Sequence, residues 1–426
     1  MFHCTIFFGK PEIVIINFPE KPESVLKIYF ESYGCTLSKS EAGLYVNRML
    51  SEGGELVKNP EDADLSVIGT CVVIKHTQDR MMSRIEDLSR QSKVKVLGCL
   101  PSVSGGALDS DRIEVLQPKD FRSFYSGALD DVEIREPSIF DGIPINQGCT
   151  GSCNYCISRV ARGKLVSRPP EKIVNQIKMQ LGRGIREVRI SSLDTAAYGR
   201  DLNHTLPGLV GDILSIDGDF MLRIGMMEPK NTSEIIDGLL DRMADPRVYK
   251  FLHIPVQSGD NRILDLMNRE YHAGAFREIA RKFRARFPDG TISTDIISGY
   301  HNEDDESFRL TKELLLETEP EIVNITRFSP RPYTPDYESK VPSSNLVKKW
   351  TKEYSDLHKE ILSHKLESLL GRKEDIMVTE KGKPGTSVGR DASYRPVVIE
   401  GEFGLYSRLD VEIVEHGDTY LIGKPL

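Results

Sequence analysis

The sequence predicts an α/β protein in three parts. These are an N-terminal doubly wound parallel sheet, a central partial (β/α)6 barrel and a small all-β barrel at the C-terminus. Short apolar runs alternate with amphipathic segments of helical spacing through most of the 426 residues. The alternation restarts on a larger scale near residue 136, and the last stretch holds only short strands punctuated by glycine. We therefore expect three domains, at 25–135, 136–365 and 366–426.

The first part contains three apolar runs, each of which ends in a cysteine: "LKIYFESYGC", "ADLSVIGTC" and "VKVLGC". Segments of helical spacing separate the runs, so a βαβαβ unit with a parallel sheet is predicted. In such sheets ligands gather at the carboxyl ends of the strands. Cys35, Cys71 and Cys99 are therefore expected to converge. The alternative is that each is a small buried apolar residue.

The second part repeats the pattern six times. The expected strands are "IPINQG", "EVRISS", "FMLRIGMM", "KFLHIPVQ", "TISTDIIS" and "EIVNITRFS". Six β/α units in series predict a parallel barrel or part of one, with the working groups at the strand carboxyl ends. A long helix within 343–371 follows. After it, about 55 residues of short strands predict a small β-barrel.

Composition sets the class of protein. With 39% hydrophobic and 28% charged residues, the chain is expected to be globular, not disordered or collagen-like. No apolar run is long enough to span a bilayer, and a cytoplasmic location without membrane attachment is expected. The seven cysteines are an odd number without a secretory signal, which favours ligand roles over disulfides. Residues 1–24, with Cys4, are interpreted as an accessory extension.

Cys149, Cys153 and Cys156 form the pattern C-x3-C-x2-C directly after the first expected barrel strand. Structural zinc sites almost always have four ligands, and the nearest histidine along the barrel, His204, is distant in sequence. A 4Fe-4S cluster held by three thiolates leaves one iron open, and an open iron can chelate S-adenosylmethionine. Zinc and a redox pair remain the alternatives.

This pattern, with Tyr155 before the last cysteine, resembles the radical S-adenosylmethionine (radical SAM) enzymes. From Val25 onward the layout resembles the methylthiotransferases. The branch that modifies threonylcarbamoyladenosine in tRNA, in its archaeal and eukaryotic form, is the most similar, by "INQGCTGSCNYC", "RVARGKLVSRP", "SSLDTAAYGRD", "MLRIGMMEPK", "FLHIPVQSGDNRILDLMNREY", "TDIISGY" and "FSPRPYTP". Two departures are Ser38, where the family commonly has asparagine, and "GYHNE" at 299–303, where it has a stretch like G-F-P-G-E.

The resemblance implies a mechanism and its cofactors. Cys35, Cys71 and Cys99 would hold a second 4Fe-4S cluster, whose open iron bears a sulfur atom that one S-adenosylmethionine methylates. A second S-adenosylmethionine, at the first cluster, would give a 5′-deoxyadenosyl radical that activates carbon 2 of the adenine for methylthiolation. The tail would be an RNA-binding TRAM domain. The implied partners are tRNA and an electron donor such as a flavodoxin or ferredoxin.

Further residues are candidates for the cofactor and the RNA. Tyr155, Ser192, Asp194, Gln257 and Asp295 are expected to contact S-adenosylmethionine, and a structural hydrogen bond is the alternative for the last four. Although the net charge is −8, residues 157–189 carry nine Lys or Arg against two Glu. Phosphate contacts are expected there from Arg159, Arg162, Lys164 and Arg168; an ordinary solvated face is the alternative. The substrate carboxylate is expected at Arg327 and Arg331.

Three other functions remain open. A methylthiotransferase could act on isopentenyladenosine in tRNA or on an aspartate of a ribosomal protein. From a different class, the chain could be a non-catalytic, zinc-stabilised RNA-binding protein.

Overall fold

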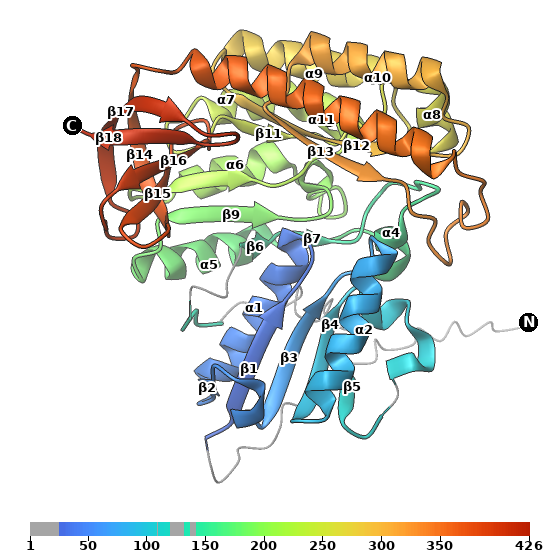
Figure 1. The fold of residues 1–426 in the computed structure, drawn as a ribbon. Coiled ribbons are helices and arrows are strands. Elements are labelled where there is room, and N and C mark those ends of the chain that lie inside the picture. The colour runs from blue at the N-terminus through green and yellow to red at the C-terminus, as the bar shows by residue number, and fades with distance from the viewer. Residues whose placement is uncertain (1–24, 109, 120–131, 137–141) are drawn as a thin grey trace, which may run out of the picture.

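The structure is a computed structural model that describes residues 25–108, 110–119, 132–136 and 142–426 (Figure 1). Residues 1–24, including Cys4, lie outside the described part. Figure 1 shows the N-terminal sheet below the half-barrel. The small β-barrel and helix α4 (Ile157–Arg162) lie on opposite sides of the half-barrel. Among the described residues, no helix has both the length and the apolar character that a membrane crossing requires.

The N-terminal sheet is parallel and has the strand order β2-β1-β3-β4-β5. Its strands are β1 (Lys27–Ser32), β2 (Glu55–Leu56), β3 (Leu65–Thr70), β4 (Lys93–Gly98) and β5 (Ile113–Val115), and its helices are α1 (Thr36–Ser51) and α2 (Lys75–Ser89). Successive strand residues point to opposite faces. Val67 packs in one core with Leu44 of α1, and Ile68 packs in another with Ile85 of α2. The helices therefore cover opposite faces, which confirms the doubly wound arrangement.

The half-barrel contains all six predicted strands in two parallel sheets. One sheet has the order β10-β9-β6 and the other β11-β12-β13. The strands are β6 (Ile143–Pro144), β9 (Glu187–Ser191), β10 (Met221–Ile224), β11 (Phe251–His253), β12 (Thr291–Ser298) and β13 (Ile322–Arg327). A parallel bridge between Leu222 and Val248 brings the two sheets together beside β10. One continuous buried core joins both sheets to their helices, so the six strands form a single partial barrel.

Helices alternate with these strands, as the spacing predicts. They are α5 (Pro170–Gly182), α6 (Leu206–Leu214), α7 (Pro229–Met243), α8 (Asn261–Leu266), α9 (Ala273–Arg286) and α10 (Asp305–Thr318). The segment after β6 holds the short strands β7 (Asn146–Gln147) and β8 (Val166–Ser167), paired antiparallel, with α4 (Ile157–Arg162) between them. This irregular excursion carries the C-x3-C-x2-C pattern.

The long helix α11 (Ser344–Glu367) joins the half-barrel to the C-terminal barrel. Near its start, Trp350 stacks on Phe308 of α10 at 5.7 Å between ring centroids. Near its end, Leu362 and Leu366 enter the core of the C-terminal barrel. One amphipathic helix thus fixes the two parts relative to each other.

The C-terminal part is a closed barrel in the order β14-β15-β16-β18-β17. Its strands are β14 (Lys373–Lys381), β15 (Thr386–Arg390), β16 (Pro396–Glu400), β17 (Arg408–His416) and β18 (Leu421–Pro425). Met377 packs against Phe251, and Arg408 pairs with Asp219 at 2.8 Å. Phe251 begins β11 and Asp219 precedes β10, so this barrel covers the amino ends of the half-barrel strands. The cysteines follow carboxyl ends, on the opposite side.

Candidate functional site

The C-x3-C-x2-C loop is held in place by backbone geometry at Gly148. This residue has a φ of +76°, and a Cβ atom there would lie 2.0 Å from the carbonyl oxygen of Lys164. Any other residue would therefore push the two segments apart. Cys149 continues in a parallel bridge with Lys164. At the other end of the loop, Cys156 occupies the N-cap of α4.

Two of the three sulfurs of this loop, those of Cys149 and Cys153, lie beside Gly151. The Gly151 N–H donates to Cys149 Sγ at 3.2 Å. A Cβ atom on Gly151 would lie 3.5 Å from Cys149 Sγ and 3.8 Å from Cys153 Sγ. Burial raises the pKa of Cys149 to about 12, and burial also raises the pKa of Cys156. Such thiols bind as thiolates only when a cationic group stabilises the deprotonated form, as the irons of a cluster do. The donor set suits a three-thiolate cluster.

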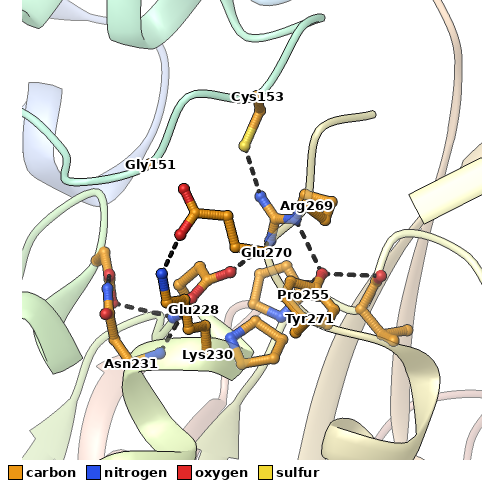
Figure 2. A network of polar contacts seen from close by, with 12 residues as sticks. Gly151, Cys153, Glu228, Lys230, Asn231, Pro255, Arg269, Glu270 and Tyr271 are labelled. Atoms are coloured by element: carbon orange, nitrogen blue, oxygen red, sulfur yellow. Dashed lines mark hydrogen bonds and ion pairs between the residues drawn. The ribbon is translucent and has the colours of Figure 1, made fainter. Parts of the chain in front are cut away.

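Figure 2 shows a buried arginine that points at this loop from the half-barrel. Arg269, in the segment after α8, donates from Nη1 to Cys153 Sγ at 3.0 Å. Its Nη2 lies 3.6 Å from a carboxylate oxygen of Glu228, and its Nε donates to the Tyr271 hydroxyl at 2.9 Å. Only 8% of the Arg269 side chain is exposed. The guanidinium therefore sets a fixed positive charge against a cysteine sulfur.

A second polar chain links the same loop to β9 and α7. Asp194 follows β9 and is buried, and its carboxylate accepts hydrogen bonds from the N–H groups of Ala196 and Glu228 and from the Asn231 amide at 2.6 Å. The Asn231 amide also donates to Thr150 Oγ1 at 3.1 Å. Burial raises the pKa of Asp194. Two segments far apart in sequence, one after β9 and one at the start of α7, thus hold the loop in one position.

The second group of cysteines lies at the carboxyl edge of the N-terminal sheet, as predicted. Cys35, Cys71 and Cys99 follow the neighbouring strands β1, β3 and β4. A Cβ atom on Gly34 would lie 3.1 Å from the Cys71 Cβ and 3.7 Å from its sulfur, so the β1 loop passes directly over Cys71. Desolvation is the main cause of the raised pKa of Cys35, and the neighbouring Cys99 and Cys71 thiols raise it further. The three sulfurs therefore lie within electrostatic range of one another. This donor set also suits a three-thiolate cluster.

A buried ion pair lies between the two cysteine groups. Arg162, the last residue of α4, donates from Nε to Cys99 Sγ at 3.2 Å. Its Nη1 pairs with Glu41 of α1 at 2.5 Å, and both side chains are almost fully buried. Glu41 also accepts a hydrogen bond from the Gln147 amide at 3.3 Å. The pair therefore ties the half-barrel loop to the N-terminal sheet.

In the described part of the chain, no three His, Cys, Asp or Glu side chains are grouped closely enough to hold a single metal ion.

Comparisons with known proteins agree with this arrangement. Residues 143–315 match the radical SAM superfamily, and residues 27–116 match the uncharacterized protein family UPF0004. The chain is 33% identical to the probable threonylcarbamoyladenosine tRNA methylthiotransferase of Pyrococcus abyssi, over 94% of this chain and 99% of that protein. The chain belongs to the family of threonylcarbamoyladenosine tRNA methylthiotransferases. Its members include the probable enzyme of Archaeoglobus fulgidus, 35% identical over 94% of this chain and 98% of that protein. The threonylcarbamoyladenosine tRNA methylthiotransferase of Xenopus laevis is 31% identical, over 94% of this chain and 77% of that protein.

A solved structure shows the same fold. The radical S-adenosylmethionine methyltransferase of Kitasatospora setae, with cobalamin and a [4Fe-4S] cluster bound, matches with a TM-score of 0.54 at 12% identity. The match covers 74% of this chain and 77% of that chain.

The residues predicted to bind the cofactor fall into two groups. Tyr155 lies within the cysteine loop, and its hydroxyl is 3.4 Å from Arg269 Nη1, while Asp194 contributes charge at Cys149. The Ser192 hydroxyl accepts the Asp194 N–H at 2.8 Å. Gln257 and Asp295 lie further along the half-barrel.

Gln257 has a φ of +70°, and its backbone N–H donates to the Asp295 carbonyl. The Asp295 carboxylate accepts the Asn324 amide at 2.7 Å and lies 3.2 Å from His253 Nε2. The adjacent strands β11, β12 and β13 therefore each contribute one side chain, His253, Asp295 and Asn324, to a single polar cluster inside the half-barrel.

The prediction of four phosphate contacts needs correction. Arg159 and Lys164 are exposed, whereas Arg162 and Arg168 are buried. Arg168 donates to the Pro144 carbonyl at 3.1 Å and to the Gln176 side chain at 2.8 Å. The guanidinium groups of Arg168 and Arg162 thus bind partners within the protein. Neither side chain can reach an RNA backbone in this conformation.

The two arginines expected at the substrate carboxylate also differ. Arg327 ends β13 and is exposed. Arg331 is buried, donates to the side chain of Gln78 on α2, and is close enough to Cys71 for the two to interact electrostatically. Only Arg331 therefore lies beside a cysteine group.

Sequence reasoning missed the three residues that act most directly on the cysteine sulfurs or their arginines: Arg269, Glu228 and Glu41. Arg269 lies 116 residues from Cys153 in sequence. No spacing in the sequence connects Arg269 with Cys153. The signal that could have pointed to Arg269 is its place in "LMNREY", part of one of the stretches that resemble the family.

The loop at 299–303, "GYHNE", closes on itself through Glu303. Its carboxylate accepts the N–H groups of Gly299 and Tyr300, and burial raises the pKa of Glu303 to about 7. An acid whose pKa is raised on folding stabilises the fold below its unfolded pKa and loses that contribution as the pH rises to the folded pKa.

We expect Glu303→Gln to gain stability relative to the parent chain between pH 4.5 and about 7, by up to about 3 kcal/mol, and to show no further gain above that. The glutamine oxygen can still accept both N–H groups. Thermal unfolding of both chains across this pH range measures the difference, with the exposed Glu402→Gln as control. A difference that does not change with pH would contradict the burial effect.

Proposed function

We propose that the chain methylthiolates carbon 2 of the adenine in threonylcarbamoyladenosine next to the anticodon of tRNA. It does so by radical SAM chemistry with two 4Fe-4S clusters. The observation that carries this proposal is the presence of two separate cysteine trios at strand carboxyl ends, in a chain whose relatives over 94% of its length have that name. No observation favours isopentenyladenosine, a ribosomal protein aspartate or zinc-stabilised RNA binding over it.

The first cluster is assigned to Cys149, Cys153 and Cys156. When bound there, the cluster and S-adenosylmethionine supply a 5′-deoxyadenosyl radical. The chain itself holds the loop through Thr150 and Asn231, and the half-buried Tyr155 ring packs edge-on against Tyr300, with 6.2 Å between the ring centroids. Ser192, Asp194, Gln257 and Asp295 remain proposed contacts of the cofactor. The electron donor is proposed to be a flavodoxin or ferredoxin, in the cytoplasm.

The second cluster is assigned to Cys35, Cys71 and Cys99. Helix α4 begins after Cys156 and ends at Arg162, which contacts Cys99, so α4 connects the two trios; we call the region between the trios the junction. Figure 1 shows α4 where the half-barrel meets the N-terminal sheet. An adenine placed in this junction would meet the radical from one side and the methylthio donor from the other. That geometry supports transfer to one carbon without movement of the substrate between distant sites.

Arg331 is the better candidate for the carboxylate of the threonylcarbamoyl group. It lies beside Cys71, and its Nε is buried with no hydrogen-bond partner among the described residues. A guanidinium can bind a carboxylate through two parallel hydrogen bonds, which an ammonium cannot do. Arg327, exposed at the end of β13, is proposed to contact RNA at the carboxyl edge of the half-barrel.

Separate clusters predict separable losses. Replacing Cys149, Cys153 and Cys156 by alanine should leave about half of the iron and abolish S-adenosylmethionine cleavage. Replacing Cys35, Cys71 and Cys99 should also leave about half of the iron but preserve uncoupled cleavage to 5′-deoxyadenosine. Iron analysis and product chromatography after anaerobic reconstitution measure both. Zinc in place of iron, or loss of all iron in either variant, would contradict two independent clusters.

Arg159 and Lys164 are proposed to contact tRNA phosphates. Changing both to glutamine should weaken tRNA binding and lower the slope of log K against log salt by about one for each lost contact. The clusters should remain, because both side chains are exposed and the pairing of Lys164 with Cys149 is made by the backbone, which the substitution keeps. Lys352→Gln, an exposed lysine on α11, is the matched control. An equal slope in the double variant and the control would assign Arg159 and Lys164 to a solvated face.

Substrate choice follows from Arg331. Anaerobic turnover of tRNA bearing threonylcarbamoyladenosine should give the methylthio product by nucleoside mass spectrometry, whereas tRNA bearing isopentenyladenosine should not. Arg331→Gln should raise KM for the former at least about tenfold, because a charge-assisted bidentate contact is lost. Product from only the isopentenyl substrate would refute the assignment, and reaction with neither RNA would point to a protein target.

A further inference from the structure

Arg162 is placed where an arginine is costly to hold. It is buried at the end of α4, in a six-residue helix that begins directly after the cluster ligand Cys156. A buried guanidinium needs compensation, and Glu41 provides the opposite charge at 2.5 Å. The remaining Nε hydrogen bond goes to Cys99 Sγ at 3.2 Å. The Arg162 Nε–H is therefore directed at the Cys99 sulfur, while its charge also acts on Cys35 and Cys71.

The contact also joins the two trios mechanically. At about 1.5 Å per residue, α4 is about 9 Å long, with Cys156 at its start and the Cys99 donor at its end. Ser102, just after Cys99, donates to the Ala161 carbonyl at 2.9 Å. Glu41 meanwhile accepts the Gln147 amide from β7, at the other end of the cysteine loop. A displacement of the cysteine loop would therefore also displace Cys99.

The trio at Cys153 has a similar arrangement. Arg269 donates to the Cys153 sulfur at 3.0 Å and lies 3.6 Å from Glu228 (Figure 2). In the same way, Arg162 donates to the Cys99 sulfur and pairs with Glu41. Each trio thus has one buried arginine on one sulfur, with one glutamate behind it. Arginine keeps its charge at all working pH values. A hydrogen bond and a positive charge at a cluster thiolate favour the reduced, more negative state of the cluster.

We propose that Arg162 is a positioning residue of the second cluster site. It holds the Cys99 sulfur, raises the reduction potential of the cluster bound there, and ties that cluster to the Cys156 loop. This inference rests on the proposed function, since it requires a cluster on Cys35, Cys71 and Cys99. An ordinary fastening of two domains would need the Arg162–Glu41 pair but would not affect the potential.

The test isolates the second cluster in the full chain. Replacing Cys149, Cys153 and Cys156 by alanine leaves one cluster, whose midpoint potential and electron paramagnetic resonance spectrum are then measured by anaerobic redox titration. Arg162→Gln, combined with Glu41→Gln so that no charge is left buried alone, should shift the midpoint to a more negative value and change the spectrum. Arg162→Lys, which keeps the charge, should restore part of the shift. Arg90→Gln removes an exposed arginine of the same sheet domain and should change nothing.

The outcomes separate the two levels of the proposal. A parent variant that binds no iron refutes the second cluster, and with it the proposed function. A loaded Arg162→Gln/Glu41→Gln variant with an unchanged midpoint and spectrum refutes the tuning role while the clusters stand. Loss of the second cluster in the Arg162→Lys variant, with the fold retained by circular dichroism, also refutes tuning by charge and leaves Arg162 as a structural fastener.

Discussion

The whole site depends on one property of parallel sheets: successive strands all end at the same edge. Cys35, Cys71 and Cys99 are far apart in the chain, yet each directly follows a strand of one sheet, and those strands are neighbours. The half-barrel obeys the same rule, which places the C-x3-C-x2-C loop at its own carboxyl edge. Because the two edges meet around α4, two groups of three thiols share one junction.

Charge inside that junction is arranged in pairs. Burial raises the pKa values of Cys149 and Asp194, because desolvation disfavours the charged form of a thiol or a carboxyl group. Arg269 and Arg162 bring fixed positive charge to the sulfurs, and Glu228 and Glu41 balance it from behind. Breaking one partner of such a buried pair typically costs about 3–5 kcal/mol. The Arg162–Glu41 pair therefore also holds the half-barrel loop in register with the N-terminal sheet.

The C-terminal barrel is attached at the opposite end of the half-barrel. Met377 and Tyr394 pack on Phe251 at the amino ends of the strands, and α11 runs from there along the half-barrel. This position leaves the carboxyl edges and their cysteines uncovered by it. An RNA-binding role for this barrel, implied by the family resemblance, would therefore act on parts of the tRNA away from the modified base.

The sequence alone predicted the main strands of all three parts, their order of appearance and the position of six cysteines after strand ends, because periodicity and strand-terminal position are local properties of the chain. It also determined the family, since the resembling stretches cover almost the whole chain. Only the tertiary structure decided which charges are used inside the fold. These four basic residues, Arg159, Arg162, Lys164 and Arg168, look alike in sequence, yet two are exposed and two are buried. The reason is that α4 turns one face to the core of the N-terminal domain, and β8 leads Arg168 to Pro144 of β6 and Gln176 of α5. The partnerships of Arg269 with Cys153 and of Arg162 with Glu41 join residues more than a hundred positions apart, and such contacts exist only once separate elements have packed.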